Sequence, residues 1–138
     1  MKAICNNRIF KYVGSSIFVV EDGEVVDYTA GDNNFIVNGF VMNPITFFVH
    51  FKVLEGNQKM SYSDFEYILC NYVFADAVLF PNEYSGVHHL IIQGWGGVTI
   101  MITVNKEENV IRVSFDDGQE KYTSYEEALE GIRNHNKQ

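Results

Sequence analysis

Alternation of apolar and polar residues is clearest between Val87 and Phe115. From Val98 to Asn105, apolar residues occupy every second position, which is the pattern of a β-strand with one buried face. Similar apolar runs precede and follow it, and the spacers carry turn-forming Gly and Asn residues. This stretch therefore predicts a three-stranded antiparallel meander, followed by a short strand at 119–123.

The first third of the chain predicts further hairpins. Asp22-Gly23 lies between two β-branched runs, which predicts that strands 17–21 and 24–29 pair across it. Asn38-Gly39 is a second hairpin-type dipeptide, within residues 35–42. A further strand is predicted over 8–13.

Apolar residues are dense between Ile45 and Leu54. Ile45, Phe47 and Val49 alternate with Thr46, Phe48 and His50, and the preceding Pro44 suits the entry of a strand. We therefore expect a strand over 45–54 in the centre of the sheet. Residues 74–86 predict a short strand followed by a loop.

Two segments have helical spacing and helix-capping residues. Ser61 precedes an apolar stripe that predicts a helix over 62–73, and Ser124 precedes one that predicts a helix over 125–135. The fold class expected is α+β, in which an antiparallel sheet carries both helices on one face. A length of 138 residues fits a single domain, 1–138.

The formal net charge of −8 narrows the class of partner. Direct nucleic-acid binding and attachment to an anionic membrane both need clustered cations, so the charge disfavours them. No Lys or Arg occurs between Lys11 and Lys52 or between Lys59 and Lys106. An extended acidic surface and a partner with a basic surface are expected, although ordinary solvated turns would also explain the pattern.

The location of the protein follows from features that the sequence lacks. Cys5 and Cys70 are far apart and have no metal-type spacing, so two free thiols are expected. No signal-peptide pattern is evident, and no apolar run approaches the length of a membrane span, about 20 residues. The protein is expected to be cytoplasmic.

The candidate partner-binding site combines an aromatic residue with carboxylates. Trp95 is the only Trp and lies among glycines, and in a simple meander its turn falls at the same end of the sheet as Asp116 and Asp117. A Trp beside carboxylates would suit a partner that carries Arg or Lys. The alternative is a Trp95 folded over the core edge. The same site hypothesis includes the carboxylates at Glu21, Asp22 and Glu24.

Two other kinds of site remain open. A small molecule or nucleotide could occupy a pocket between helix 62–73 and the sheet, lined by Tyr62, Tyr72, Tyr84 and His88. A metal-dependent hydrolase could be centred on His88 or His89, but adjacent residues of a strand face opposite sides. The sequence contains no catalytic, phosphate-binding or metal-binding motif, so no cofactor, metal or catalytic residue is assigned and an enzyme is disfavoured.

The function expected is that of a non-enzymatic acidic protein that binds, and inhibits or sequesters, a macromolecule with a basic surface. As a small, acidic, motif-free domain, the chain resembles the small inhibitors of phages and mobile elements, such as anti-CRISPR and immunity proteins. The analogy rests on this general type, and no residues match. The small-molecule binder and the hydrolase are the alternatives. Pairing of edge strands into a homodimer is also left open.

Overall fold

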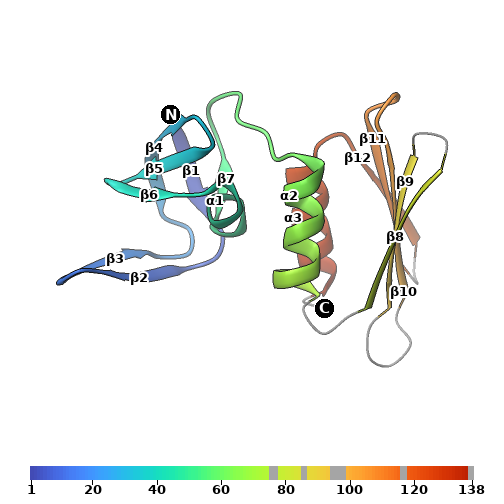
Figure 1. Ribbon diagram of the computed structural model, residues 1–138, viewed down its shortest axis with the longest axis horizontal. Helices are drawn as coiled ribbons and strands as arrows, with labels where there is room; N and C mark the ends of the chain where they lie inside the picture. The colour runs from blue at the N-terminus through green and yellow to red at the C-terminus, as the bar shows by residue number, and fades with distance from the viewer. Residues whose placement is uncertain (75–77, 85–86, 94–98, 116–117, 137–138) are drawn as a thin grey trace. The chain divides into compact units, whose positions relative to one another are not determined.

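The computed structural model describes residues 1–74, 78–84, 87–93, 99–115 and 118–136. The chain divides into two compact units, Met1–Met60 (unit 1) and Ser61–Gln138 (unit 2), and each is described by itself. The fold class is α+β with antiparallel sheets, as predicted, but the described residues form three α-helices and a π-helical segment where two helices were expected (Figure 1). The single domain stays a prediction.

Unit 1 is built on a five-stranded sheet in the order β6-β5-β4-β1-β7. Every neighbouring pair in it is antiparallel. Its strands are β1 (Lys2–Cys5), β4 (Val25–Gly31), β5 (Asn34–Val37), β6 (Phe40–Met42) and β7 (Phe51–Val53). A separate two-stranded sheet pairs β2 (Ile9–Val13) with β3 (Ser16–Val20).

The two hairpin predictions in unit 1 had different outcomes. Pairing across Asp22-Gly23 was wrong, because β3 pairs with β2 whereas β4 pairs with β1 and β5. This turn instead carries the chain from one sheet to the other. The Asn38-Gly39 hairpin is confirmed, with φ angles of 49° and 82° that place both residues in the left-handed region.

The predicted central strand over 45–54 was also wrong in most of its length. Residues Pro44–His50 form helix α1, with Pro44 in its first turn and the Asn43 side chain accepting a hydrogen bond of 2.8 Å from the Thr46 amide. Consecutive residues Phe47, Phe48 and Val49 are all buried, which a one-sided strand would not allow. Only Phe51–Val53 is a strand, and it lies at a sheet edge.

Aromatic side chains form the core of unit 1. The rings of Phe35 and Phe47 stack with centroids 4.0 Å apart, and Tyr28 lies 5.2 Å from Phe47. The Tyr28 hydroxyl donates a hydrogen bond of 2.6 Å to the Glu55 carbonyl, so its polar end is satisfied although the residue is buried. These contacts attach α1 to the inner face of the sheet.

Unit 2 contains the predicted meander, extended by one strand on each side. The sheet order is β12-β11-β10-β9-β8, all antiparallel. The strands are β8 (Val78–Tyr84), β9 (Val87–Gln93), β10 (Thr99–Asn105), β11 (Val110–Phe115) and β12 (Gly118–Tyr122). The short strand expected within 74–86 therefore continues to Tyr84 and pairs with β9.

Two helical segments cover one face of this sheet (Figure 1). Helix α2 (Tyr62–Ile68) continues as the π-helical segment η1 (Leu69–Val73), and α3 (Tyr125–Asn136) follows the sheet. Ser61 caps α2 and Ser124 caps α3, as predicted, through hydrogen bonds to the amides of Asp64 and Glu127. The unit 2 core holds Phe65, Ile68, Leu69, Leu90, Ile92, Ile100, Ile102, Val104, Ile111, Val113, Ala128, Leu129 and Ile132.

Candidate functional site

The predicted partner-binding residues fall in different parts of the chain. Trp95, Asp116 and Asp117 lie outside the described residues, so their proximity stays a prediction. Glu21, Asp22 and Glu24 are described and belong to unit 1, in the turn between β3 and β4.

This turn, residues 21–24, is called here the acidic turn. The amide of Gly23 donates a hydrogen bond of 2.7 Å to the Cys5 carbonyl, and the Glu24 amide donates one of 3.1 Å to the Glu21 carbonyl. All three carboxylates act on the Cys5 thiol, whose pKa is raised first by burial and then by their negative charges. Glu21, Asp22 and Glu24 therefore share one four-residue turn, and their charges all raise the pKa of the Cys5 thiol.

The carboxylates of the acidic turn are not equally available. The Arg8 Nε–H group donates a bifurcated hydrogen bond to both carboxylate oxygens of Glu21, at 3.0 and 2.9 Å, so the Glu21 charge is paired with that of Arg8. Among the residues that the structure describes, Asp22 and Glu24 form no ion pair, and both are exposed. They are the carboxylates free to meet a cation from outside.

Beside the acidic turn stands the β2–β3 hairpin, whose two faces differ in burial. One face turns Ile9, Phe18 and Val20 toward the core, and the Phe18 ring stacks on Phe40 with centroids 4.6 Å apart. An isolated two-stranded hairpin is marginal in water, so this buried face is what attaches it to unit 1. Figure 1 shows the hairpin as a ribbon separate from the five-stranded sheet of the same unit.

The opposite face carries an exposed row of apolar side chains, called here the hairpin face. In the strand register Phe10 lies opposite Val19, and Tyr12 lies opposite Ile17. Tyr12 is 76% exposed, Ile17 58% and Phe10 42%. The Phe10 and Tyr12 rings meet edge to face, with centroids 5.1 Å apart.

A salt bridge joins the hairpin face to the acidic turn. The Arg8 guanidinium lies over the Phe10 ring, 5.6 Å from its centroid, and binds Glu21 at the same time. Aromatic, cationic and carboxylate groups therefore follow one another along a continuous surface of unit 1.

Sequence reasoning missed the hairpin face, although a signal for it was present. In segments 9–13 and 16–20, apolar residues occur at consecutive positions, so they lie on both faces of each strand. A strand with one buried face requires apolar residues on that face alone. The surplus apolar residues are those that the structure exposes.

Of the alternative pocket residues, the structure brings Tyr62 and His88 together but not Tyr72. Tyr62 of α2 stacks on His88 of β9 with centroids 4.3 Å apart, and Lys106 Nζ lies 5.5 Å from the Tyr62 centroid. Tyr72 is exposed and packs beside Tyr67 instead. The backbone of Tyr84 pairs with Val87 in the sheet, and its side chain lies outside the described residues.

The Tyr62 phenol is held in its neutral form. Burial raises its pKa well above the ordinary value, and the charge of Glu66 and a hydrogen bond to that carboxylate raise it further. Such a phenol is a poor proton donor or nucleophile near neutral pH. This aromatic cluster is therefore better suited to packing than to proton transfer.

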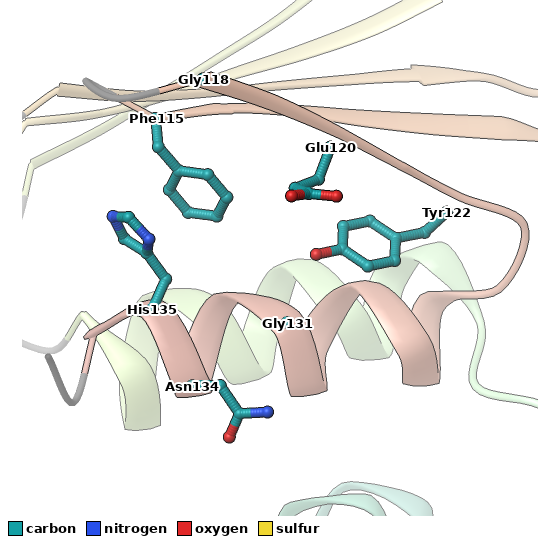
Figure 2. Close-up of a pocket in the computed structure, with 7 residues that line it drawn as sticks. All are labelled: Phe115, Gly118, Glu120, Tyr122, Gly131, Asn134 and His135. Carbon is teal, nitrogen blue, oxygen red and sulfur yellow. The ribbon is translucent and has the colours of Figure 1, made fainter.

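A pocket of about 260 Å³ lies elsewhere in unit 2, between α3 and strands β11 and β12 (Figure 2). We call it the α3 pocket. The Phe115 and His135 rings stack at one end of it, with centroids 3.9 Å apart. The Glu120 carboxylate and the Tyr122 hydroxyl face the same space from β12. Gly118, Gly131 and Asn134 complete the lining.

No group of three or more His, Cys, Asp or Glu residues in the described ranges could hold a metal ion. Within those same ranges, no helix combines the length and the hydropathy needed to cross a membrane. Cys5 and Cys70 are both free thiols, as expected.

Comparison of the chain with known protein families, with curated proteins and with solved structures finds no match. The function therefore has to be argued from the surface of the molecule.

Proposed function

We propose that the protein is a non-enzymatic binding protein that attaches to a protein with a basic surface and thereby inhibits or sequesters it. The hairpin face makes the central contact, and the acidic turn makes the polar contact beside it. The observation that supports this proposal is the row of exposed Phe10, Tyr12 and Ile17 beside the half-buried Val19, on a hairpin that is anchored by its other face.

The apolar row has the composition of a binding surface. Single exposed apolar residues are normal on proteins, but contiguous apolar patches, especially those rimmed by polar residues, mark sites of interaction. Two aromatic rings at its centre supply large contact areas at low cost in side-chain entropy. Truncating such an anchor commonly weakens binding by about 2 kcal/mol or more.

The charge around the row defines the chemistry of the partner. Asp22 and Glu24 carry unmatched negative charge, and the chain has no Lys or Arg between Lys11 and Lys52. A partner that fits is therefore a protein with an apolar cleft bordered by Lys or Arg. Charge complementarity of this kind accelerates association and excludes acidic partners.

The backbone of the hairpin offers a further contact. Strands β2 and β3 form a sheet of two strands, so each has an outer edge with hydrogen-bonding groups directed outward. An extended segment of the partner can pair with such an edge, which adds main-chain hydrogen bonds to the side-chain contacts.

Photo-crosslinking from both faces of the hairpin tests the proposal. A benzophenone side chain is placed at position 17, on the hairpin face, or at position 13, whose Val is 46% exposed on the other face. A basic protein that is cross-linked from position 17 and not from position 13 supports the proposal. Equal cross-linking from both positions, no cross-linking, or cross-linking only to a second copy of the chain contradicts it.

Salt dependence tests the part assigned to the acidic turn. The double variant Asp22→Asn/Glu24→Gln should bind the cross-linked partner more weakly at low salt and should lose most of the salt dependence that the wild type shows. The matched control is Asp32→Asn, which removes an exposed carboxylate outside the acidic turn. If all these proteins respond to salt alike, the acidic turn does not contact the partner.

A further inference from the structure

Strand β12 places a carboxylate where a packed sheet would carry an apolar side chain. Glu120 lies opposite Val113 in the register, and Val113 is buried on the face that the helices cover. Glu120 itself is exposed, because the α3 pocket opens beside it. Within the described part of the chain it forms no ion pair.

The rest of the α3 pocket supplies an aromatic wall, made of two rings that stack face on face. Phe115 and His135 stack with an interplanar angle of 25°, one from the end of β11 and the other from the last turn of α3. Figure 2 shows their rings beside the open space into which Glu120 and Tyr122 project. None of the seven residues drawn there is Lys or Arg.

An aromatic wall and a carboxylate select for one kind of group. A guanidinium is planar, stacks on aromatic rings and donates two parallel hydrogen bonds that match a carboxylate. A Lys ammonium is compact and strongly hydrated, so it gains less from such a wall. The pocket volume of about 260 Å³ is small for a drug-sized ligand, but it suits one such group.

We propose that the α3 pocket binds a guanidinium group, which stacks on the Phe115–His135 pair and is held by the Glu120 carboxylate. The group can come from an arginine side chain of another protein or from a small free guanidino compound. The proposal goes beyond the function assigned to the hairpin face and does not rest on it, so either can fail alone.

The neighbourhood of Gly131 shapes the pocket. A Cβ atom at Gly131 would collide with the Tyr122 hydroxyl and would lie 2.6 Å from Tyr122 Cζ. The absence of a side chain there lets the Tyr122 ring lie against α3. Its hydroxyl then remains near Glu120, as an additional hydrogen-bonding group at the mouth of the pocket.

Titration with methylguanidinium and with N-acetyl-arginine amide, followed by amide NMR, tests the proposal. A dissociation constant of about 1–10 mM is expected for such small probes, with shifts centred on Gly118 and Gly131. Glu120→Gln should weaken binding about tenfold or more, and N-acetyl-lysine amide should bind several-fold more weakly than the arginine probe. Glu107→Gln, which removes an exposed carboxylate outside the pocket, is the matched control and should bind like the wild type.

The two probes distinguish the sources of the group. Binding of both supports an arginine side chain, and binding of methylguanidinium alone supports a small free compound. No binding of either probe at concentrations up to about 10 mM, the upper end of the expected range of dissociation constants, overturns the proposal. Binding that Glu120→Gln leaves unchanged also overturns it, and Glu120 would then serve only to protect an edge strand from pairing.

Discussion

Replacement of Gly131 by Ala tests directly how Tyr122 packs on α3. Gly131 lies inside the helix, where Ala is normally more stable than Gly by about 1 kcal/mol. The packing of Tyr122 on α3 counteracts this stabilisation, because the new Cβ atom would lie 2.6 Å from Tyr122 Cζ and 3.0 Å from Tyr122 Cε1. Both atoms belong to a rigid ring, so the whole side chain has to move.

The two effects can be weighed against each other. Overpacking of this kind costs about 1–3 kcal/mol. We therefore expect Gly131→Ala to leave the free energy of unfolding of unit 2 unchanged or to lower it by up to about 2 kcal/mol. In a Tyr122→Ala background the obstacle is gone, and the same substitution should raise it by about 1 kcal/mol. The coupling between the two sites should then be about 1–3 kcal/mol.

Urea unfolding of the four proteins in this cycle provides the measurement. Far-UV circular dichroism follows the unfolding transition, and both substituted residues lie in unit 2. If Gly131→Ala stabilises both backgrounds equally, Tyr122 does not lie on Gly131, and the described shape of the α3 pocket is wrong.

Three further predictions concern a helix cap, two thiols and a phenol. Asn43→Ala should lower the free energy of unfolding of unit 1 by about 1 kcal/mol in urea denaturation, because it removes the cap of α1, whereas the exposed Asn57→Ala should change it by less than about 0.5 kcal/mol. A thiol reagent followed by mass spectrometry should label Cys70 before Cys5, because Cys5 is fully buried and Cys70 is not; equal rates would contradict the placement of Cys5. Folding raises the pKa of Tyr62 above its ordinary value of 10.0. The contribution of this buried phenol to the free energy of unfolding is therefore complete below pH 10.0 and is lost as the pH rises further. Tyr62→Phe should therefore flatten the fall of the unfolding free energy above that pH, and an unchanged slope would contradict the burial of this phenol.

The parts of the fold that the sequence predicted well are those in which local pattern and tertiary environment agree. Residues 98–105 are apolar at every second position, with Met101 as the one additional apolar residue, and β10 has one face on the core. Ser61 and Ser124 both cap helices, because their hydroxyl groups satisfy helix amides wherever the helix packs.

The errors arise where the pattern is ambiguous or the partner is distant. Residues 45–50 are apolar at nearly every position, so a strand and a fully packed helix fit equally well. Asn43-Pro44 was the better signal, because Asn caps helices and Pro suits their first turn. In the prediction from sequence, Pro44 served only as a residue that suits the entry of a strand. Asp22-Gly23 does form a turn, but strand β4 finds its partners in β1 and β5, which a local signal cannot identify.

The candidate site was less predictable than the fold. The sequence indicated the carboxylates of the acidic turn as candidate binding residues. It did not indicate that they lie near Arg8 and the hairpin face, because that proximity depends on the pairing of β2 with β3. The α3 pocket joins residues from Phe115 to His135 that belong to two strands and a helix. Such convergence is a product of tertiary packing, and no local spacing indicates it.

The central claim is that Tyr12, on the hairpin face, anchors a basic partner. Calorimetric titration of the partner identified by cross-linking against Tyr12→Thr and Val13→Thr tests it most directly, because both variants introduce the same residue on opposite faces of one strand. Tyr12→Thr should raise the dissociation constant about thirtyfold, which corresponds to about 2 kcal/mol, and Val13→Thr should change it by less than about threefold. Equal effects of the two substitutions, or no effect of Tyr12→Thr, would contradict the account.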